Sequence, residues 1–156
     1  MTAPVAGRYQ INAFTGSYRF LSNFYPCIVR FDGYAYASAE HAYQAAKTTS
    51  EWERARIRSC GTAANAKARG RTLAIRADWD TIKHDVMLTI VREKFLYEPL
   101  RDQLYSTIPH ELVEGNYWHD NYWGICTCPR CGGSGWNRLG KILMQVRSEI
   151  AAPTRF

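Results

Sequence analysis

The chain has 156 residues, 46% of them apolar, a length that suits one compact domain rather than two ordinary ones. Its 20 Lys and Arg against 14 Asp and Glu give a net charge of +6, which favours a phosphate-bearing ligand or nucleic acid and excludes a strongly acidic disordered chain. The sequence shows neither a signal peptide nor an apolar run of about 18 residues, so we expect a soluble, cytoplasmic protein with no membrane partner.

The first predicted elements are an N-terminal arm and a hairpin. Residues 1–13 show no periodicity and are expected to form the arm, followed by one domain over 14–150 and a tail over 151–156. Apolar residues alternate on both sides of Asp32-Gly33, and Gly supplies the positive φ of a type I′ turn. We therefore predict a small antiparallel sheet over 27–36.

Caps and apolar periodicity then predict helices along most of the remaining chain. Ser38, Ser50 and Asp78 are the expected caps of the first three, and the third is expected to be the central helix. The predicted helices cover about 39–48, a short segment from residue 51, 79–97, 99–105 and 139–150, with a brief strand at 111–114.

One cluster that can carry chemistry lies on the first helix. Helical spacing puts Glu40, Tyr43 or Gln44, and Lys47 along one stripe, so a carboxylate and an ammonium group can share a pocket. The same spacing fits a solvated helix face. His41 points away from Glu40 and is expected to make structural hydrogen bonds.

A second cluster is the polar and aromatic segment 112–124, which is typical of a functional loop. Asp120 can order a water molecule or a sugar hydroxyl, and Trp123 can stack on a base. An aromatic loop folded back on the core is the alternative.

Two helix starts can contact an anionic ligand. Trp79 and Lys83 lie at the start of one helix, and Asn137 lies at the start of the last one. Trp79 also fits a core anchor, and Lys83 also fits a surface ion pair.

The third cluster is the Cys/Gly-rich loop 126–135. Cys128 and Cys131 form a C-x-x-C knuckle, and Cys126 can be a third ligand of a structural zinc. Reduced thiols in a mobile loop are the alternative. No pattern of a catalytic zinc site accompanies the cysteines. The candidates for the fourth ligand are His119, Cys27, Cys60 and water.

The positive charge is concentrated between Glu51 and Arg76, where seven basic residues face two acidic ones. Together with exposed rings and the cysteine knuckle, this stretch suggests a second function class. In that class the chain is a zinc-knuckle, basic nucleic-acid-binding module without catalytic turnover.

The order of the motifs is more specific than any one of them. On this order the chain resembles the NADAR family of YbiA-like N-glycosidases over about residues 14–150. The S-x-E-H motif of that family corresponds to Ser38, Glu40 and His41, and its D-x-x-W-G motif to Asp120, Trp123 and Gly124. The motifs are FLSNFYP (20–26), SAEHAYQAAK (38–47), Trp79 with Lys83, DNYWG (120–124) and NRLGKILM (137–144).

This resemblance implies a single, compact, mainly helical α+β domain that hydrolyses the bond between ribose and base in a nucleotide-like substrate. It implies no cofactor for catalysis. The implied substrates are phosphorylated ribosylamino-pyrimidine intermediates of riboflavin biosynthesis, or ADP-ribosylated guanine in a nucleotide or DNA. The loop 126–135 departs from the family pattern, and both a zinc-pinned flap and an inert insertion fit it. The oligomeric state is not indicated.

We expect Glu40 to be the essential carboxylate and Asp120 to orient water or ribose, and the reverse assignment is also open. Trp79 and Trp123 would stack on the base or close the pocket. The residues expected to bind substrate are Phe20, Asn23, Lys47, Trp79, Lys83, Trp123, Gly124 and Asn137.

Overall fold

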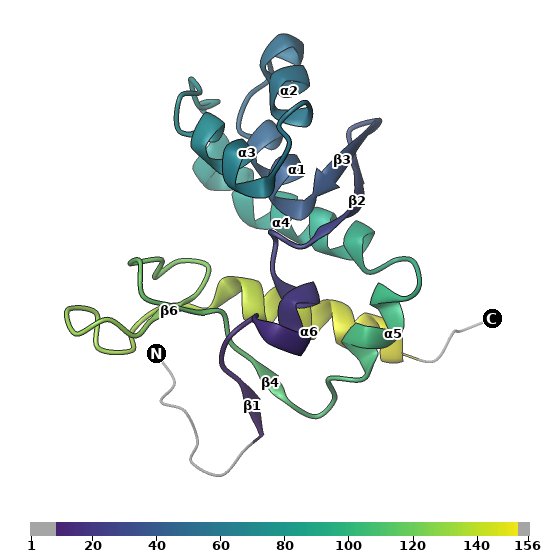
Figure 1. Cartoon of the computed structure of the whole chain (residues 1–156), viewed down its shortest axis with the longest axis vertical. Helices are drawn as coiled ribbons and strands as arrows, with labels where there is room; N and C mark the ends of the chain where they lie inside the picture. The colour runs from purple at the N-terminus through teal and green to yellow at the C-terminus, as the bar shows by residue number, and fades with distance from the viewer. Residues whose placement is uncertain (1–8, 153–156) are drawn as a thin grey trace. The chain divides into compact units, whose positions relative to one another are not determined.

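The computed structural model describes residues 9–152, so parts of the predicted arm and tail lie outside the described residues. The described chain forms two compact units, one of residues 22–97 and one of residues 9–21 with 98–152. Both units combine helices with short strands, which confirms the α+β class (Figure 1). No sequence signal indicated the division into two units.

The 22–97 unit consists of a hairpin and four helices. Strands β2 and β3 are antiparallel, and Asp32 and Gly33 have φ values of 47° and 83°, as the predicted type I′ turn requires. The hairpin prediction is therefore confirmed. The elements are β2 (Pro26–Phe31), β3 (Tyr34–Ser38), α1 (Ala39–Ala46), α2 (Glu51–Arg58), α3 (Ala63–Gly70) and α4 (Trp79–Lys94).

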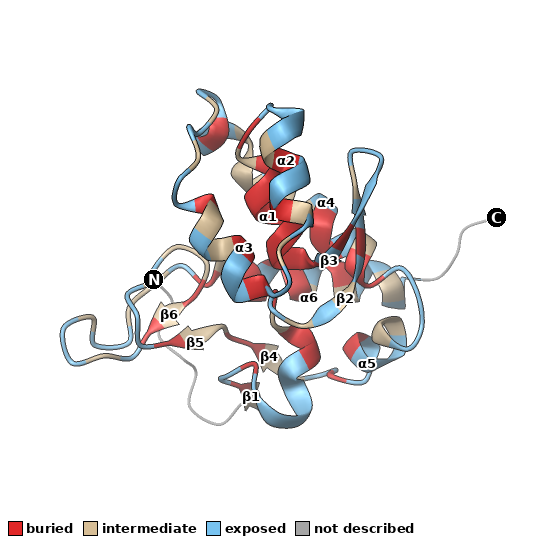
Figure 2. Ribbon diagram, turned by 45° about the horizontal axis from the view of Figure 1, so that its top comes forward, coloured by how far each residue is buried: buried red, intermediate tan, exposed pale blue. Residues whose placement is uncertain are grey.

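Helix α1 is the centre of this unit, in place of the longer α4. All eight of its residues are buried, and it packs against α2, α3, α4 and both strands of the hairpin (Figure 2). Ala42, Ala45 and Ala46 are almost fully buried, and their small side chains let the neighbouring helices approach closely. The sequence predicted α4 as the central helix because α4 has the longer apolar face. The burial of a helix depends instead on how many elements surround it.

Two other local expectations differ from the structure. Asp78 does not cap α4 with its side chain, because its carboxylate instead binds the guanidinium of Arg76 at 2.6 and 3.1 Å. Helix α3 was not predicted, although Thr62 caps it by accepting a hydrogen bond from the Asn65 N–H at 3.1 Å. Its basic residues form a charge pattern, whereas its alanines and its Thr62 cap are weaker signals.

The second unit is built on α6, which packs against α5 and β4 (Figure 1). Strand β1 pairs in parallel with β4, and β5 pairs in parallel with β6. Residues 10 and 11 were predicted as part of the arm, but they form a strand because they pair with Glu111 and Leu112. These partners lie about a hundred residues later in the chain, so no local pattern indicates the pairing. The elements are β1 (Gln10–Ile11), the 3-10 helix η1 (Gly16–Leu21), α5 (Leu100–Tyr105), β4 (Glu111–Leu112), β5 (Gly115–Asn116), β6 (Ile125–Cys126) and α6 (Arg138–Ala151).

Among the described helices, none combines the length and the apolar character that crossing a bilayer requires.

Candidate active site

The start of α1 is held by hydrogen bonds from two sides. Ser38 Oγ accepts from the His41 N–H at 3.1 Å and so caps the helix as predicted. The Asn23 carbonyl oxygen accepts from the Glu40 N–H at 3.0 Å, which ties the FLSNFYP segment to the first turn. These bonds fix the backbone from which the Glu40 side chain extends.

The His41 side chain is part of this structural framework, as expected. Its Nε2 lies 2.9 Å from the carbonyl oxygen of Cys60, which can only accept, so Nε2 carries the proton. Nδ1 is then an acceptor for the Ser38 hydroxyl at 2.6 Å. Both ring nitrogens are therefore used in linking α1 to the end of α2.

Glu40 is buried and is bonded by a neighbour on its own helix. The residue is 7% exposed, and Gln44 Nε2 donates to its Oε1 at 2.8 Å. Burial raises the pKa of Glu40 and is the largest effect, while the Gln44 hydrogen bond and the positive charges of Lys67 and Lys47 oppose it. A carboxylate in such an environment is suited to stabilising a positive charge that develops beside it.

The charges around Glu40 are positive and come from several elements. Burial lowers the pKa of Lys47 most strongly, the Glu40 carboxylate raises it, and nearby Lys67, Arg71 and Lys83 lower it further. Lys47 ends α1, Lys67 lies on α3 and Lys83 lies on α4. This arrangement can bind an anionic group such as a phosphate close to a buried carboxylate.

Aromatic side chains and two further predicted residues complete this part of the 22–97 unit. The rings of Tyr43 and Trp79 lie 5.2 Å apart, and Lys47 Nζ lies 5.2 Å from the Tyr43 ring centre. Lys83 forms an ion pair with Asp80 at 3.1 Å, which is the surface pairing that the sequence left open. Asn23 is buried, and its Nδ2 lies 3.5 Å from Met87 Sδ.

In the other unit, Asp120 organises the D-x-x-W-G turn. Its Oδ1 accepts hydrogen bonds from the backbone N–H groups of Tyr122 and Trp123 at 3.2 and 2.9 Å. Asn116 holds Asp120 in turn, because its Oδ1 accepts from the Asp120 N–H and its Nδ2 donates to the Asp120 carbonyl. Oδ1 is therefore the carboxylate oxygen that holds this turn.

Gly124 and Asn137 hold this loop against the start of α6. A Cβ on Gly124 would overlap the Glu114 carbonyl oxygen, so only Gly fits there. Asn137 has φ 49°, accepts from the Glu114 N–H at 3.0 Å and donates to the Leu112 carbonyl oxygen at 2.9 Å. Both polar atoms of its amide are thus bound to backbone. Phe20 is buried in η1 of the same unit.

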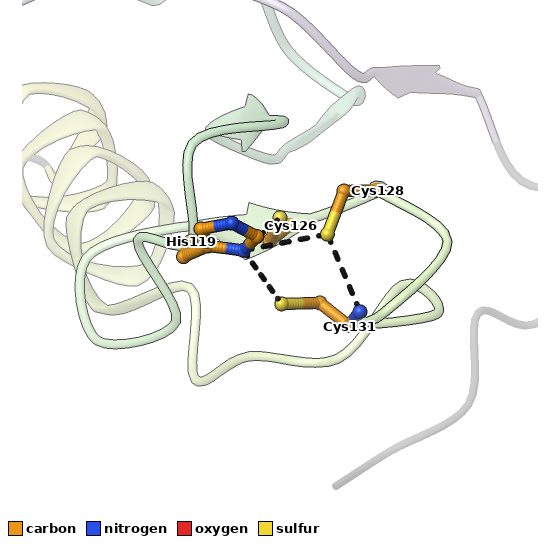
Figure 3. A group of neighbouring side chains, drawn as sticks. All are labelled: His119, Cys126, Cys128 and Cys131. Carbon is orange, nitrogen blue, oxygen red and sulfur yellow. Dashed lines mark hydrogen bonds between the residues drawn. The ribbon is translucent and has the colours of Figure 1, made fainter.

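The side chains of His119, Cys126, Cys128 and Cys131 converge at the end of the same loop (Figure 3). One ligand atom from each lies within 4.8 Å of the others, so the four can hold a metal ion. His119 is therefore the fourth member of the predicted cysteine cluster, and Cys27 and Cys60 belong to the 22–97 unit.

The predicted residues are thus divided between the units: Asn23, Glu40, Lys47, Trp79 and Lys83 in one, Phe20, Asp120, Trp123, Gly124, Asn137 and the three cysteines in the other. Sequence reasoning missed Lys67 and Arg71, which it assigned to a basic stretch, and Asn116, whose spacing of four from Asp120 was the available signal. A shallow pocket lined by Arg30, Asp32, Thr89 and Glu93, among others, contains none of the predicted site residues.

Comparison with known proteins gives one family. The sequence model of the NADAR domain matches residues 11–151. The chain is 40% identical over 134 residues to a riboflavin biosynthesis protein of Vibrio vulnificus; the match covers 84% of this chain but only 35% of that protein. It is 36% identical over 133 residues to N-glycosidase YbiA of Escherichia coli, covering 83% of this chain and 80% of YbiA. The NMR structure of E. coli YbiA is similar with a TM-score of 0.77 and 33% identity, over 92% of this chain and 86% of that one.

Proposed function

This chain belongs to the NADAR family, which confirms the resemblance in motif order, and we propose that it is an N-glycosidase. The proposed reaction is hydrolysis of the bond between the ribose C1′ and a base nitrogen in a nucleotide-like substrate. The observation that carries it is the buried Glu40 carboxyl group, which lies near the positive charges of Lys67 on α3 and Lys47 at the end of α1. Two kinds of relative are named for compatible activities, N-glycosidase and riboflavin biosynthesis.

The reaction needs charge stabilisation and two proton transfers. The C1′–N bond breaks with its electron pair going to the base nitrogen, and positive charge grows on the ribose. Water then bonds to C1′ and loses a proton to a general base, while the departing nitrogen gains one from a general acid. Carboxyl groups can supply all of these functions, so the proposal assigns no metal to bond cleavage.

We assign the stabilisation of the ribose charge to Glu40. A buried carboxylate interacts strongly with a positive charge because little water screens it. Gln44 orients the carboxylate through the 2.8 Å hydrogen bond, and the positive charges of Lys47 and Lys67 favour its ionised form. Both interactions oppose the effect of burial, which raises the pKa of Glu40.

The anion and base contacts are assigned to the same part of the 22–97 unit. Lys47 and Lys83 are the proposed phosphate-binding groups, with Lys67 and Arg71 adding positive charge. Trp79, beside Tyr43, is the proposed stacking surface for the base. The substrate class is therefore a ribosyl base that carries phosphate, either a phosphorylated ribosylamino-pyrimidine or ADP-ribosylated guanine.

Residues of the other unit have weaker support as direct ligands. Asp120 remains the proposed water- or ribose-orienting group, and Trp123 remains a proposed stacking residue. The bond from the Trp123 N–H to Asp120 Oδ1 holds the two in one turn. Asn137 and Gly124 are better explained as positioning residues. The Asn137 amide is bonded to the backbone of Glu114 and Leu112, and a Cβ at Gly124 would overlap the Glu114 carbonyl oxygen.

Exposed aromatic and basic side chains favour a second candidate function, binding of nucleic acid. Arg56 lies over the Trp52 ring at 4.5 Å, and Trp52 is 62% exposed. Arg58 lies over the exposed Tyr34 ring at 3.9 Å. Such pairs can contact a phosphate and a base of a single strand together. This function and hydrolysis are compatible if the substrate is ADP-ribosylated nucleic acid.

The test measures product release by mass-resolved chromatography. The two substrates are a phosphorylated ribosylamino-pyrimidine and ADP-ribosylated guanine in single-stranded DNA. The enzymes compared are the wild type, Glu40→Gln and the matched control Glu51→Gln, whose side chain is exposed on α2. We expect Glu40→Gln to bind substrate but to lose at least about 100-fold in kcat, and Glu51→Gln to retain it.

Each outcome has one interpretation. Base plus sugar phosphate from the first substrate indicates a metabolite N-glycosidase, and ADP-ribose from the second indicates a nucleic-acid repair hydrolase. Wild-type turnover in Glu40→Gln would exclude Glu40 as the key carboxylate. Binding of DNA with no release from either substrate would favour the binding-module function.

A further inference from the structure

We propose that His119, Cys126, Cys128 and Cys131 bind one zinc ion, and that this ion positions the loop that carries Asp120 and Trp123. The proposal concerns the 9–21 and 98–152 unit alone. Its evidence is the geometry of the four ligand atoms and the place of the ligands in the chain (Figure 3). It goes beyond the proposed hydrolysis, in which no metal takes part.

The separations of the ligand atoms fit tetrahedral zinc. His119 Nδ1 lies 3.3 Å from Cys131 Sγ, 3.4 Å from Cys128 Sγ and 3.9 Å from Cys126 Sγ. Zinc bonds of about 2.3 Å to sulfur and about 2.0 Å to nitrogen at the tetrahedral angle place these atoms about 3.5 Å apart. An ion can therefore sit among the four atoms with small movements of the side chains.

A backbone amide of the C-x-x-C segment points at one of its two sulfur atoms. The Cys131 N–H donates to Cys128 Sγ at 3.3 Å. The Gly132 N–H donates to the Cys128 carbonyl oxygen at 2.8 Å, which closes the turn. Gly132 and Gly133 have φ of 62° and 82°, a region in which Gly pays no steric penalty. The turn thus presents two sulfurs to one point.

His119 reaches the cluster through an uncommon backbone conformation. Its φ is 70°, in the left-handed region that residues with a Cβ rarely adopt. Such conformations persist where other interactions fix them, and coordination of the ring provides one. Within the described residues, the ring nitrogen Nδ1 faces three sulfur atoms and no carboxylate. A soft donor set of one imidazole and three thiols selects zinc over calcium or magnesium.

Four protein ligands close the coordination sphere, which is the pattern of a structural rather than a catalytic zinc. The ligands flank the D-x-x-W-G turn: His119 directly precedes Asp120, and Cys126 lies in β6 just after Gly124. An ion that joins His119 to Cys126 therefore closes the loop between them. Asp120 becomes held by the ion on one side and by Asn116 on the other.

Metal content and cobalt binding test the site. Protein purified without a histidine tag is analysed for bound zinc, and the apoprotein is titrated with Co²⁺ under reducing conditions. We expect one zinc per chain and the visible absorption of tetrahedral cobalt thiolate. Cys128→Ser and Cys131→Ser should weaken metal binding at least about tenfold, whereas Cys27→Ser and Cys60→Ser, the matched controls, should not. A wild type without zinc and without cobalt thiolate absorption would overturn the site.

Amide hydrogen exchange tests the positioning role on the wild type, with and without the metal. Chelation should speed exchange at the Tyr122 and Trp123 amides, which Asp120 holds, and leave α4 unchanged. A zinc-loaded protein whose loop exchanges equally after chelation would overturn this role, as would faster exchange throughout the chain. Neither readout uses turnover, so failure of the proposed hydrolysis would leave both interpretable.

Discussion

Gln44 donates a hydrogen bond to the buried Glu40 carboxylate, with 2.8 Å between Nε2 and Oε1. The Gln44 amide packs against Gly70 in the last turn of α3, where a Cβ would overlap Gln44 Oε1. The close packing of α1 and α3 therefore sets the surroundings of the proposed catalytic carboxylate.

Substituting Gly70→Ala tests this relationship. The added methyl group displaces the Gln44 amide and weakens its bond to Glu40, and because that bond lowers the pKa of Glu40, the pKa should rise. If the carboxylate is the active form, the acidic limb of the kcat/KM pH profile moves to higher pH. The control is Gly61→Ala, where a Cβ meets nothing within 4 Å. Coincident profiles for the two variants would contradict the assignment.

Substituting Glu40→Gln should change how stability depends on pH. Burial raises the pKa of Glu40 on folding, so ionisation carries no penalty below its ordinary value of 4.5 and costs stability as the pH rises through the raised pKa. The variant cannot ionise there and escapes the penalty. Its melting temperature relative to wild type should be higher at about pH 8 than at about pH 4.

The measurement is thermal unfolding of wild type, Glu40→Gln and Glu51→Gln across that pH range. Glu51 is exposed, so the melting temperature of Glu51→Gln relative to wild type should not rise between about pH 4 and about pH 8 in this way. A constant difference for Glu40→Gln would mean that the carboxyl titrates alike in the folded and unfolded chains.

Asn116→Ala should destabilise the loop around Asp120. Asn116 is 3% exposed, and its amide satisfies the N–H and carbonyl groups of Asp120. Leaving such groups without partners costs about 2 kcal/mol in the free energy of unfolding. Denaturant unfolding measures the loss, with Asn12→Ala, an exposed asparagine of the same unit, as the control. Equal stability of the two variants would show that water replaces the Asn116 amide.

Removing both Arg56 and Arg58 tests the nucleic-acid candidate. If they contact phosphates, the double alanine variant binds single-stranded DNA more weakly, and the slope of log K against log salt falls by about 1.4. Turnover of a free nucleotide substrate should not change. The control is Arg19→Ala, an exposed arginine of the other unit. An unchanged salt slope would show that this face does not bind the strand.

Local sequence signals predicted much of the fold correctly. The turn at Asp32-Gly33, the Ser38 cap and the apolar face of α6 each depend on residues close in the chain, so their patterns are visible without a structure. Strand β1 was missed because its partner lies about a hundred residues away. Helix α3 was not predicted because its basic residues were interpreted as a charged stretch, although Thr62 and the alanines are helix signals.

The sequence by itself determined the family, through the order of its motifs. The S-x-E-H motif of that resemblance is also what led to Glu40 as the proposed carboxylate. Only the tertiary structure decided which charges lie near Glu40, since Lys67 on α3 reaches it through the packing of α1 against α3. It also distinguished His119 from Cys27 and Cys60 as the partner of the cysteine knuckle. Electrostatic and coordination distances depend on how separate segments pack, and a one-dimensional pattern does not contain them.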